Sequence, residues 1–243
     1  CMYGAGLAAN ERYMTKEEAA MVTETDLQPG TSSSTSIFYQ YGSNVETFDE
    51  FEYFVGVSKV PAYCFYRCSS LKSVKLPGNV TSIETRAFQE CYLLESIELP
   101  RNVASVGQSA FNSCSKLKEI TINDNLQNIG SYAFGSCSSI ERVNISSIDV
   151  VFGIVYADKA SAFADNGRNV SFYVDGNVID SIVVPDGITK INGYAFYGWK
   201  QLKNITLHNG ITSIGDRAFA STNITSMVVP NSVTTLGASV FDN

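Results

Sequence analysis

Four of the six cysteines recur at a constant interval, and they are the first candidates for chemistry in the sequence. Cys68, Cys91, Cys114 and Cys137 follow one another at intervals of 23 residues. Thiols at such a spacing could form disulfides, bind a metal ion, or pack as small apolar side chains. A metal site would need clustered Cys and His ligands, yet the single histidine, His208, lies far along the chain. Because the four thiols share one position of a repeat, we expect a column of buried free thiols with neighbours about 4.8 Å apart.

Histidine and aspartate side chains are the other candidates, and each has a simpler interpretation. His208 stands where other copies of the repeat have proline after a strand, so we expect a solvated turn residue. Five aspartates between residues 158 and 186 could bind calcium or act as the paired carboxylates of a glycoside hydrolase. Asp165-Asn166-Gly167 and Asp175-Gly176 are, however, ordinary turn sequences. The sequence therefore predicts no catalytic residue, no metal site and no cofactor.

A longer repeat must position all of these side chains. Phe65, Phe88, Phe111 and Phe134 show the same period of 23 residues as the cysteines. A fixed period of this length indicates a solenoid of stacked coils, in which no coil can bury its apolar face alone. We therefore expect the Leu, Ile, Val and Phe side chains to point towards a common axis.

One copy of the repeat, LKSVKLPGNVTSIETRAFQECY, runs from Leu71 to Tyr92. The alternation in Val74-Lys75-Leu76 predicts a short half-buried strand that ends at Pro77-Gly78. The stretch Val80–Ile83 predicts a second, shorter extended piece. The spacing of Ala87-Phe88 and Cys91 predicts a single helical turn. The stretch from Ile224 to Pro230 repeats the first of these strands near the end of the chain.

The period divides the chain into four predicted segments. They are an N-terminal cap and linker over residues 1–47, a first leucine-rich repeat group over 48–145, an irregular enlarged coil or hairpin insertion over 146–178, and a second repeat group over 179–243. The insertion is indicated by Ile140 and Ile179, which share a phase but lie 39 residues apart. Within it, Asp175-Gly176 is a tight-turn signal.

Two capping boxes mark helices near the N-terminal end of the repeats. Thr15 to Glu18 predicts a short helix that continues to about Val22. Phe48 has the phase of Leu71, and the capping box from Thr47 to Glu50 predicts that this first copy is helical rather than extended.

Composition excludes several classes of function. Apolar residues make up 44% of the chain, which is enough for a continuous core. The net charge is −7 and no cluster of Lys and Arg is present, so nucleic acid and anionic lipid surfaces are disfavoured as partners. No apolar run is long enough to span a bilayer.

The pattern LxxIxLPxxVTSIGxxAFxxC resembles the BspA-type leucine-rich repeat of bacterial surface proteins, over residues 48–145 and 179–243. Met14–Ala19 and Phe48–Phe54 also resemble the N-terminal segment of Bacteroidetes members. The resemblance implies a right-handed leucine-rich repeat superhelix with short parallel β-strands on one side, irregular or 3-10 turns on the other, and a small α-helical N-terminal cap. It implies an extracellular or cell-surface location and adhesion to host or bacterial proteins or glycans. Cys1 is a candidate for a lipid anchor, with a domain boundary as the alternative.

The best candidate for a ligand surface is the outward face of the stacked strands, because outward side chains alternate with buried ones. Its columns are small and polar, and the alternative is an ordinary solvated sheet face. The candidate residues are Ser73, Lys75, Ser96, Glu98, Glu119, Thr121, Arg142, Asn144, Ser181, Asn204 and Thr206. The aromatic segment 150–174 is a second candidate surface, with core filling as its alternative. We therefore expect a non-enzymatic binding module, or alternatively a structural spacer that displays another domain.

Overall fold

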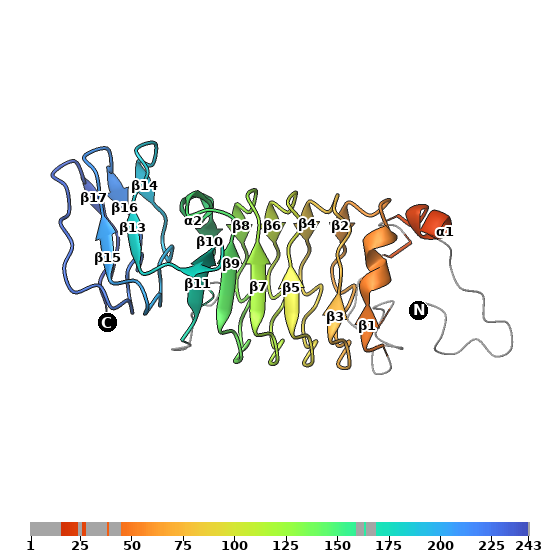
Figure 1. Ribbon diagram of the computed structural model, residues 1–243. Helices are drawn as coiled ribbons and strands as arrows, with labels where there is room; N and C mark the ends of the chain where they lie inside the picture. Colours follow the sequence, from red (N-terminus) through yellow and green to blue (C-terminus); the bar gives the residue numbers. More distant parts are fainter. Residues whose placement is uncertain are drawn as a thin grey trace, which may run out of the picture.

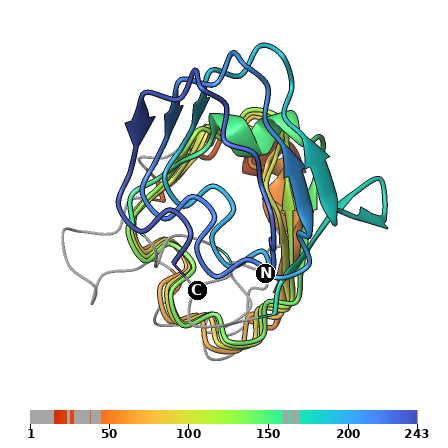
Figure 2. The same ribbon diagram turned by 90° about the vertical axis from the view of Figure 1, so that its left-hand side faces the viewer.

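The computed structural model describes residues 16–23, 26–27, 38, 45–158, 163 and 169–242. The chain forms an elongated stack of coils whose short strands lie side by side along the stack (Figure 1). Viewed along the stack, the coils of the first group superimpose on one another and wind round a common axis (Figure 2). The predicted repeat solenoid with short parallel strands is therefore present.

Two five-stranded sheets run along the first group of coils, on two sides of the stack. The first sheet is parallel and consists of β2 (Lys59–Val60), β4 (Ser82–Ile83), β6 (Ser105–Val106), β8 (Asn128–Ile129) and β10 (Val155–Tyr156). The second consists of β5 (Ser96–Glu98), β7 (Glu119–Ile122), β9 (Arg142–Ile145), β11 (Ser171–Val174) and β12 (Asn177–Val178). Only β12 is antiparallel to its neighbour.

The remaining elements form the two ends of the stack and its central joint. At the N-terminal end lie α1 (Lys16–Ala20), β1 (Thr47–Phe48), the 3-10 helix η2 (Asp49–Tyr53) and β3 (Ser73–Val74). The second group contains β13 (Ser181–Val183) paired with β15 (Asn204–Thr206), and a sheet of β14 (Lys190–Ile191), β16 (Ser213–Ile214) and β17 (Thr235–Leu236). The short helix α2 (Asp149–Gly153) lies at the joint.

The core is a column of stacked phenylalanine rings. Phe65, Phe88, Phe111 and Phe134 stack with centroid separations of 4.8, 5.1 and 5.3 Å and nearly parallel planes. Phe38 of the N-terminal segment extends the column, at 4.8 Å from Phe65. Each ring is thus covered on both faces by rings of the neighbouring coils, which is why a single coil has no core of its own.

The predicted column of free thiols is confirmed. Cys64 and the four cysteines of the repeat are free and buried. Three of these thiols reach the backbone of the preceding coil: Cys91 Sγ donates to the carbonyl oxygen of Phe65 at 3.0 Å, Cys114 Sγ to that of Phe88 at 3.2 Å, and Cys137 Sγ to that of Phe111 at 3.0 Å. The thiol therefore satisfies a buried carbonyl group while filling a small apolar space.

The helical turn predicted for Ala87 to Cys91 is wrong. Arg86 and Glu90 have positive φ angles of 58° and 63°, so the backbone forms successive tight turns rather than a helix. The amide of Ala87 bonds to Glu84 within the coil, whereas the amide of Phe88 bonds to Ala110 of the next coil. Alternate N–H groups are needed for the neighbouring coil, and a continuous helix would have used them internally.

The first copy of the repeat also differs from the prediction of a helix. Thr47–Phe48 is extended and pairs with β3, and only Asp49–Tyr53 is helical, as a 3-10 helix. Phe48 precedes that helix without a side-chain cap, so Thr47 is not its capping residue. Phe48 is the register partner of Val74 and not of Leu71, which shares its phase in the sequence. The pairing is thus shifted by three residues, and β1 pairs directly with β3, the strand of the next copy.

The α-helix at the N-terminal end is shorter than predicted. It ends at Ala20, and Thr15, its predicted N-cap, lies outside the described residues. Ala19 is buried, and the Lys16 ammonium lies 4.0 Å from the centre of the Tyr53 ring. The helix therefore packs against η2.

The two groups of coils are separate sheets that meet at an aromatic joint. β11 turns into β12 through Asp175-Gly176, both with positive φ, and β13 starts a new sheet. Trp199, which takes the place of a cysteine, stacks on Phe172 with ring centroids 3.6 Å apart. Asn192 Nδ2 donates to the carbonyl oxygens of Phe152 and Ile154. Figure 2 shows the second group (blue) displaced sideways from the first.

The strand predicted for Ile224 to Pro230 is not formed. The offset between paired residues falls from 23 for Lys190 and Ser213 to 22 for Ser213 and Thr235. The missing residue lies in the segment that would have been the strand, since Asn223 still bonds to Lys200 at the regular offset of 23. The ladder with β15 is therefore lost, and Val228 is 82% exposed.

Removal of one ring from the phenylalanine column should destabilise the whole stack. We expect Phe111→Ala to lower the free energy of unfolding by about 3–5 kcal/mol, because it leaves a cavity between two stacked rings. Urea denaturation followed by circular dichroism measures the change. Val183→Ala, at an exposed apolar residue, is the control and should change stability by about 0.5 kcal/mol or less. A loss under about 1 kcal/mol for Phe111→Ala would contradict the role of the column.

Thiol reactivity provides a second test of the core. Burial raises the pKa of the Cys91 and Cys114 thiols, so at about pH 8 they stay protonated and unreactive as nucleophiles. In a Cys1→Ser variant we expect Ellman's reagent to modify no thiol in the folded protein and all five after unfolding in guanidinium. Rapid modification of the folded protein would show that the column is accessible.

Candidate functional site

The outward face of β5, β7 and β9 carries two straight rows of side chains. Ser96, Glu119 and Arg142 are register partners in one row, and Glu98, Thr121 and Asn144 are partners in the other. The residues between them point inwards and are buried, as in Ile97, Ile120 and Val143. The alternation predicted from the sequence is therefore present, and each of the six outward residues is exposed or half-buried.

The structure divides the remaining predicted surface residues between two other places. Ser181 pairs with Asn204 in the second group, and Thr206 pairs with the exposed Val183. Ser73 pairs with Thr47 at the N-terminal end rather than with Ser96. Lys75 follows β3 directly and lies in no strand. Ten of the eleven candidate residues thus belong to three separate sheet segments instead of one continuous face.

A cluster of charged, amide and aromatic groups lies on β7, β9 and β11, and we call it the Arg142 cluster. Arg142 Nε donates to Asn144 Oδ1 at 2.9 Å and lies 3.6 Å from Glu119 Oε1. Asn144 Nδ2 in turn donates to Glu119 Oε1 at 2.5 Å. The guanidinium of Arg142 lies over the ring of Tyr173, 3.6 Å from its centroid. These contacts hold a cation and an aromatic ring in fixed positions on the face.

Tyr173 is the member of the Arg142 cluster that the sequence did not reveal as part of this face. It is the register partner of Asn144, but it lies beyond the break in the period. The β-prone stretch before Asp175-Gly176 did indicate a strand that contains Tyr173. The register of that strand against β9 could not be predicted, because the path of the insertion between them was unknown. By contrast, Phe152, Tyr156, Phe163 and Phe172 are buried, so these aromatic residues fill the core rather than form a second surface.

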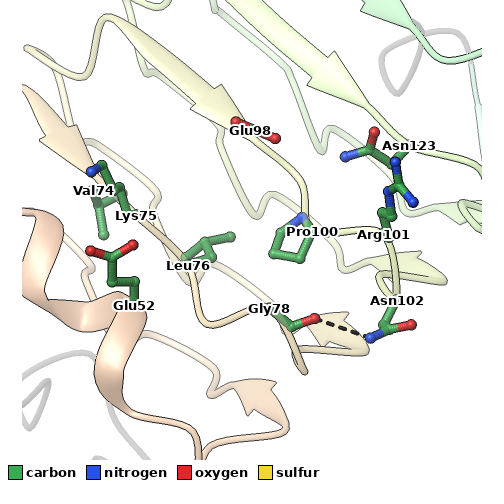
Figure 3. A pocket seen from close by; sticks show the side chains of 10 residues that line it. All are labelled: Glu52, Val74, Lys75, Leu76, Gly78, Glu98, Pro100, Arg101, Asn102 and Asn123. Carbon is green, nitrogen blue, oxygen red and sulfur yellow. Dashed lines mark hydrogen bonds between the residues drawn. The ribbon is translucent and has the colours of Figure 1, made fainter. Parts of the chain in front are cut away.

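A cleft of about 550 Å³ opens on the face between β3 and β5 (Figure 3). It includes Lys75 and Glu98, two of the predicted surface residues. The full lining consists of Glu52, Val74, Lys75, Leu76, Gly78, Glu98, Pro100, Arg101, Asn102 and Asn123. Glu52 belongs to η2, so the cleft extends from this 3-10 helix to the loops that follow the strands.

The histidine and two of the aspartates that were candidates for catalysis or metal binding have structural roles. His208 is half-buried rather than solvated: its Nε2 lies 3.0 Å from the Pro185 carbonyl oxygen, and Gly210 N–H donates to its Nδ1. Asp175 lies in the hairpin turn, and Asp180 forms an exposed ion pair with Lys203. Within the described ranges, no three His, Cys, Asp or Glu side chains come close enough to hold a metal ion. No helix of the described part of the chain is long and apolar enough to cross a membrane.

Comparisons with solved structures find bacterial leucine-rich repeat proteins. The T. pallidum leucine-rich repeat protein is 26% identical, with 74% of this chain and 67% of that chain covered and a TM-score of 0.40. The pneumococcal vaccine antigen PcpA is 22% identical, with 76% of this chain and 57% of that chain covered and a TM-score of 0.48. A leucine-rich cell surface protein of Faecalibacterium prausnitzii is 22% identical, with 84% of this chain and 62% of that chain covered and a TM-score of 0.35. This chain thus spans about three-fifths to two-thirds of the lengths of these neighbours.

Sequence comparisons agree with the repeat that the structure displays. No curated protein sequence matches the chain. The family model described as "BspA type Leucine rich repeat region" matches residues 34–158 and 168–243 with six copies. These ranges contain both groups of coils. The chain therefore belongs to the BspA-type leucine-rich repeat family.

Proposed function

We propose that this protein is a non-enzymatic binding module that holds an extracellular protein or glycan against the outward face of its second sheet. The observation that carries the proposal is the Arg142 cluster. Arginine and tyrosine are enriched among the residues that dominate binding at interfaces, and their immobilisation here lowers the entropy that a partner must overcome. The location at the cell surface, and the lipid anchor at Cys1, which lies outside the described residues, belong to the same proposal.

The geometry of the two rows supports contact with an extended partner. Neighbouring strands in a sheet lie about 4.8 Å apart, so three coils present a repeated set of polar groups over roughly 10 Å. Serine, threonine and asparagine side chains offer both donors and acceptors. The face therefore provides many weak contacts around the fixed Arg142, an arrangement that suits a protein or glycan surface better than a small buried ligand.

The proposal is tested by a variant of the Arg142 cluster with a matched control. In the triple variant Glu119→Ala, Arg142→Ala, Asn144→Ala we expect affinity for the partner to fall by about tenfold or more. The control replaces three exposed polar residues on the other sheet by alanine: Lys59, Gln127 and Asn128. Binding is measured by biolayer interferometry against ligands found with the wild-type protein on panels of matrix proteins and glycans.

Three outcomes of this experiment are informative. Loss of binding in the triple variant with retention in the control supports the proposal. Equal binding by both variants places the interface elsewhere and contradicts it. If the folded wild-type protein binds nothing on either panel, the alternative of a structural spacer is favoured.

A further inference from the structure

The second sheet is interrupted at one position along the first group of coils. β3 pairs with β1 and β5 pairs with β7, but β3 and β5 are not hydrogen-bonded neighbours. On the other side of the same coils, β2, β4 and β6 form an unbroken ladder. The ladder is therefore interrupted on one side only, between the bond from Glu95 N–H to the Lys72 carbonyl oxygen and the bond from Asn102 Nδ2 to that of Gly78, and the cleft lies at this interruption.

At the interruption, β3 is held by the N-terminal end of the stack. The amide of Lys72 donates to the carbonyl oxygen of Glu46 at 2.6 Å, and the Lys72 ammonium lies 2.8 Å from the Glu46 carboxylate. Ser73 Oγ donates to Asp49 Oδ1 at 3.1 Å. These contacts join β3 to β1 and η2, whereas the bond from Glu95 N–H to the Lys72 carbonyl oxygen still links its coil to that of β5.

The interruption leaves backbone groups without their usual partners. In the regular coils Leu99 N–H donates to Thr121 at 2.9 Å, and Val184 N–H donates to Thr206 at 3.0 Å. Leu76 occupies the equivalent position and would donate to Glu98, but among the described residues its N–H has no backbone partner. Leu76 is only 8% exposed, and buried N–H groups rarely stay unpaired. The cleft therefore offers one backbone donor and one backbone acceptor to a ligand.

The charges in the cleft are balanced. Lys75 and Arg101 bring two cations, Glu52 and Glu98 bring two anions, and none of the four is ion-paired with another described residue. Such a lining favours an uncharged ligand that has many hydrogen-bonding groups over a phosphate or an acidic peptide.

Amide and apolar groups complete the lining. Asn102 Nδ2 donates to the carbonyl oxygen of Gly78, and Asn123 Nδ2 donates to that of Leu99. The Oδ1 atoms of both asparagines are therefore left as acceptors for a ligand. Val74, Leu76 and Pro100 supply the apolar surface. A volume of about 550 Å³ is in the range of pockets that hold small molecules.

We propose that this cleft binds an uncharged acetamido sugar, as the terminal unit of a glycan. The acetamido group carries one carbonyl oxygen for Leu76 N–H and one N–H for the Glu98 carbonyl oxygen. Its methyl group and the apolar face of the ring contact Leu76 and Pro100, and the hydroxyl groups bond to the charged and amide side chains. The proposal rests on the proposed function, because Glu98 lies on the same outward face as the Arg142 cluster, and it names the ligand class.

The test is a titration of isotope-labelled wild-type protein with N,N′-diacetylchitobiose, monitored by NMR. We expect the shifts that change most to be those of the Lys75, Leu76 and Glu98 amides. Cellobiose has the same pyranose rings without acetamido groups, and we expect it to bind about tenfold more weakly or worse, since an unpaired backbone group costs about that much. N-acetylalanine N′-methylamide is the peptide counterpart and should also bind more weakly.

Gly78→Tyr is the variant that blocks the cleft. Gly78 lines the cleft, and a Cβ atom built on it meets nothing within 4 Å, so a larger side chain can enter without strain. The same holds for Gly187 in the second group, which makes Gly187→Tyr the matched control. We expect Gly78→Tyr to abolish binding of the disaccharide and Gly187→Tyr to leave it unchanged.

Several results would overturn the inference. They are no saturable binding of diacetylchitobiose, equal binding of cellobiose, shift changes away from the cleft, or unchanged binding by Gly78→Tyr. Tighter binding of the peptide amide would assign the cleft to a peptide ligand instead. Gly78→Tyr leaves the Arg142 cluster intact, so a failure here is distinguishable from failure of the Arg142 triple variant.

Discussion

The contact between successive coils is the interaction on which the rest of the structure depends. A coil of 23 residues places each phenylalanine ring about 5 Å from the next, and it places alternate N–H groups opposite the carbonyl groups of the neighbouring coil. Neither arrangement exists within a single coil. Stability is therefore a property of interfaces between coils, and a change in one coil reaches its neighbours through the same rings and backbone bonds.

The candidate functional features lie where this register changes. At the N-terminal end, β3 pairs with β1 at an offset of 26 residues, and the cleft lies where the ladder between β3 and β5 is missing. In the centre, the enlarged coil places Tyr173 over Arg142. A perfectly regular array would present only uniform rows of small polar side chains. The departures from the period are thus the places where distinct pockets and clusters arise.

The sequence was sufficient for the features that repeat and insufficient for those that do not. Buried Phe111, the free thiol of Cys114 and the outward position of Glu119 all followed from the period and from strand alternation. The positive φ angles of Arg86 and Glu90 did not, because neither position has glycine or asparagine and the local spacing resembles a helix. The cleft could not be predicted either, since it depends on a hydrogen bond that Leu76 fails to make although its sequence matches that of Leu99.

Charge along the strands is used in two different ways. Lys72, Glu95, Lys118 and Glu141 alternate in sign from coil to coil at the start of each strand, an order that favours the observed neighbours over a slipped pairing. Lys75 and Glu98 also have opposite charges one turn of the solenoid apart, but β3 and β5 are not ladder partners and the two side chains form no ion pair with each other. Their charges are consequently left for interactions outside the fold, in the only stretch of this face where strands β3 to β11 are not joined. The same residue pattern thus places opposite charges side by side where the ladder is continuous and leaves them without an ion pair in the cleft where it is broken.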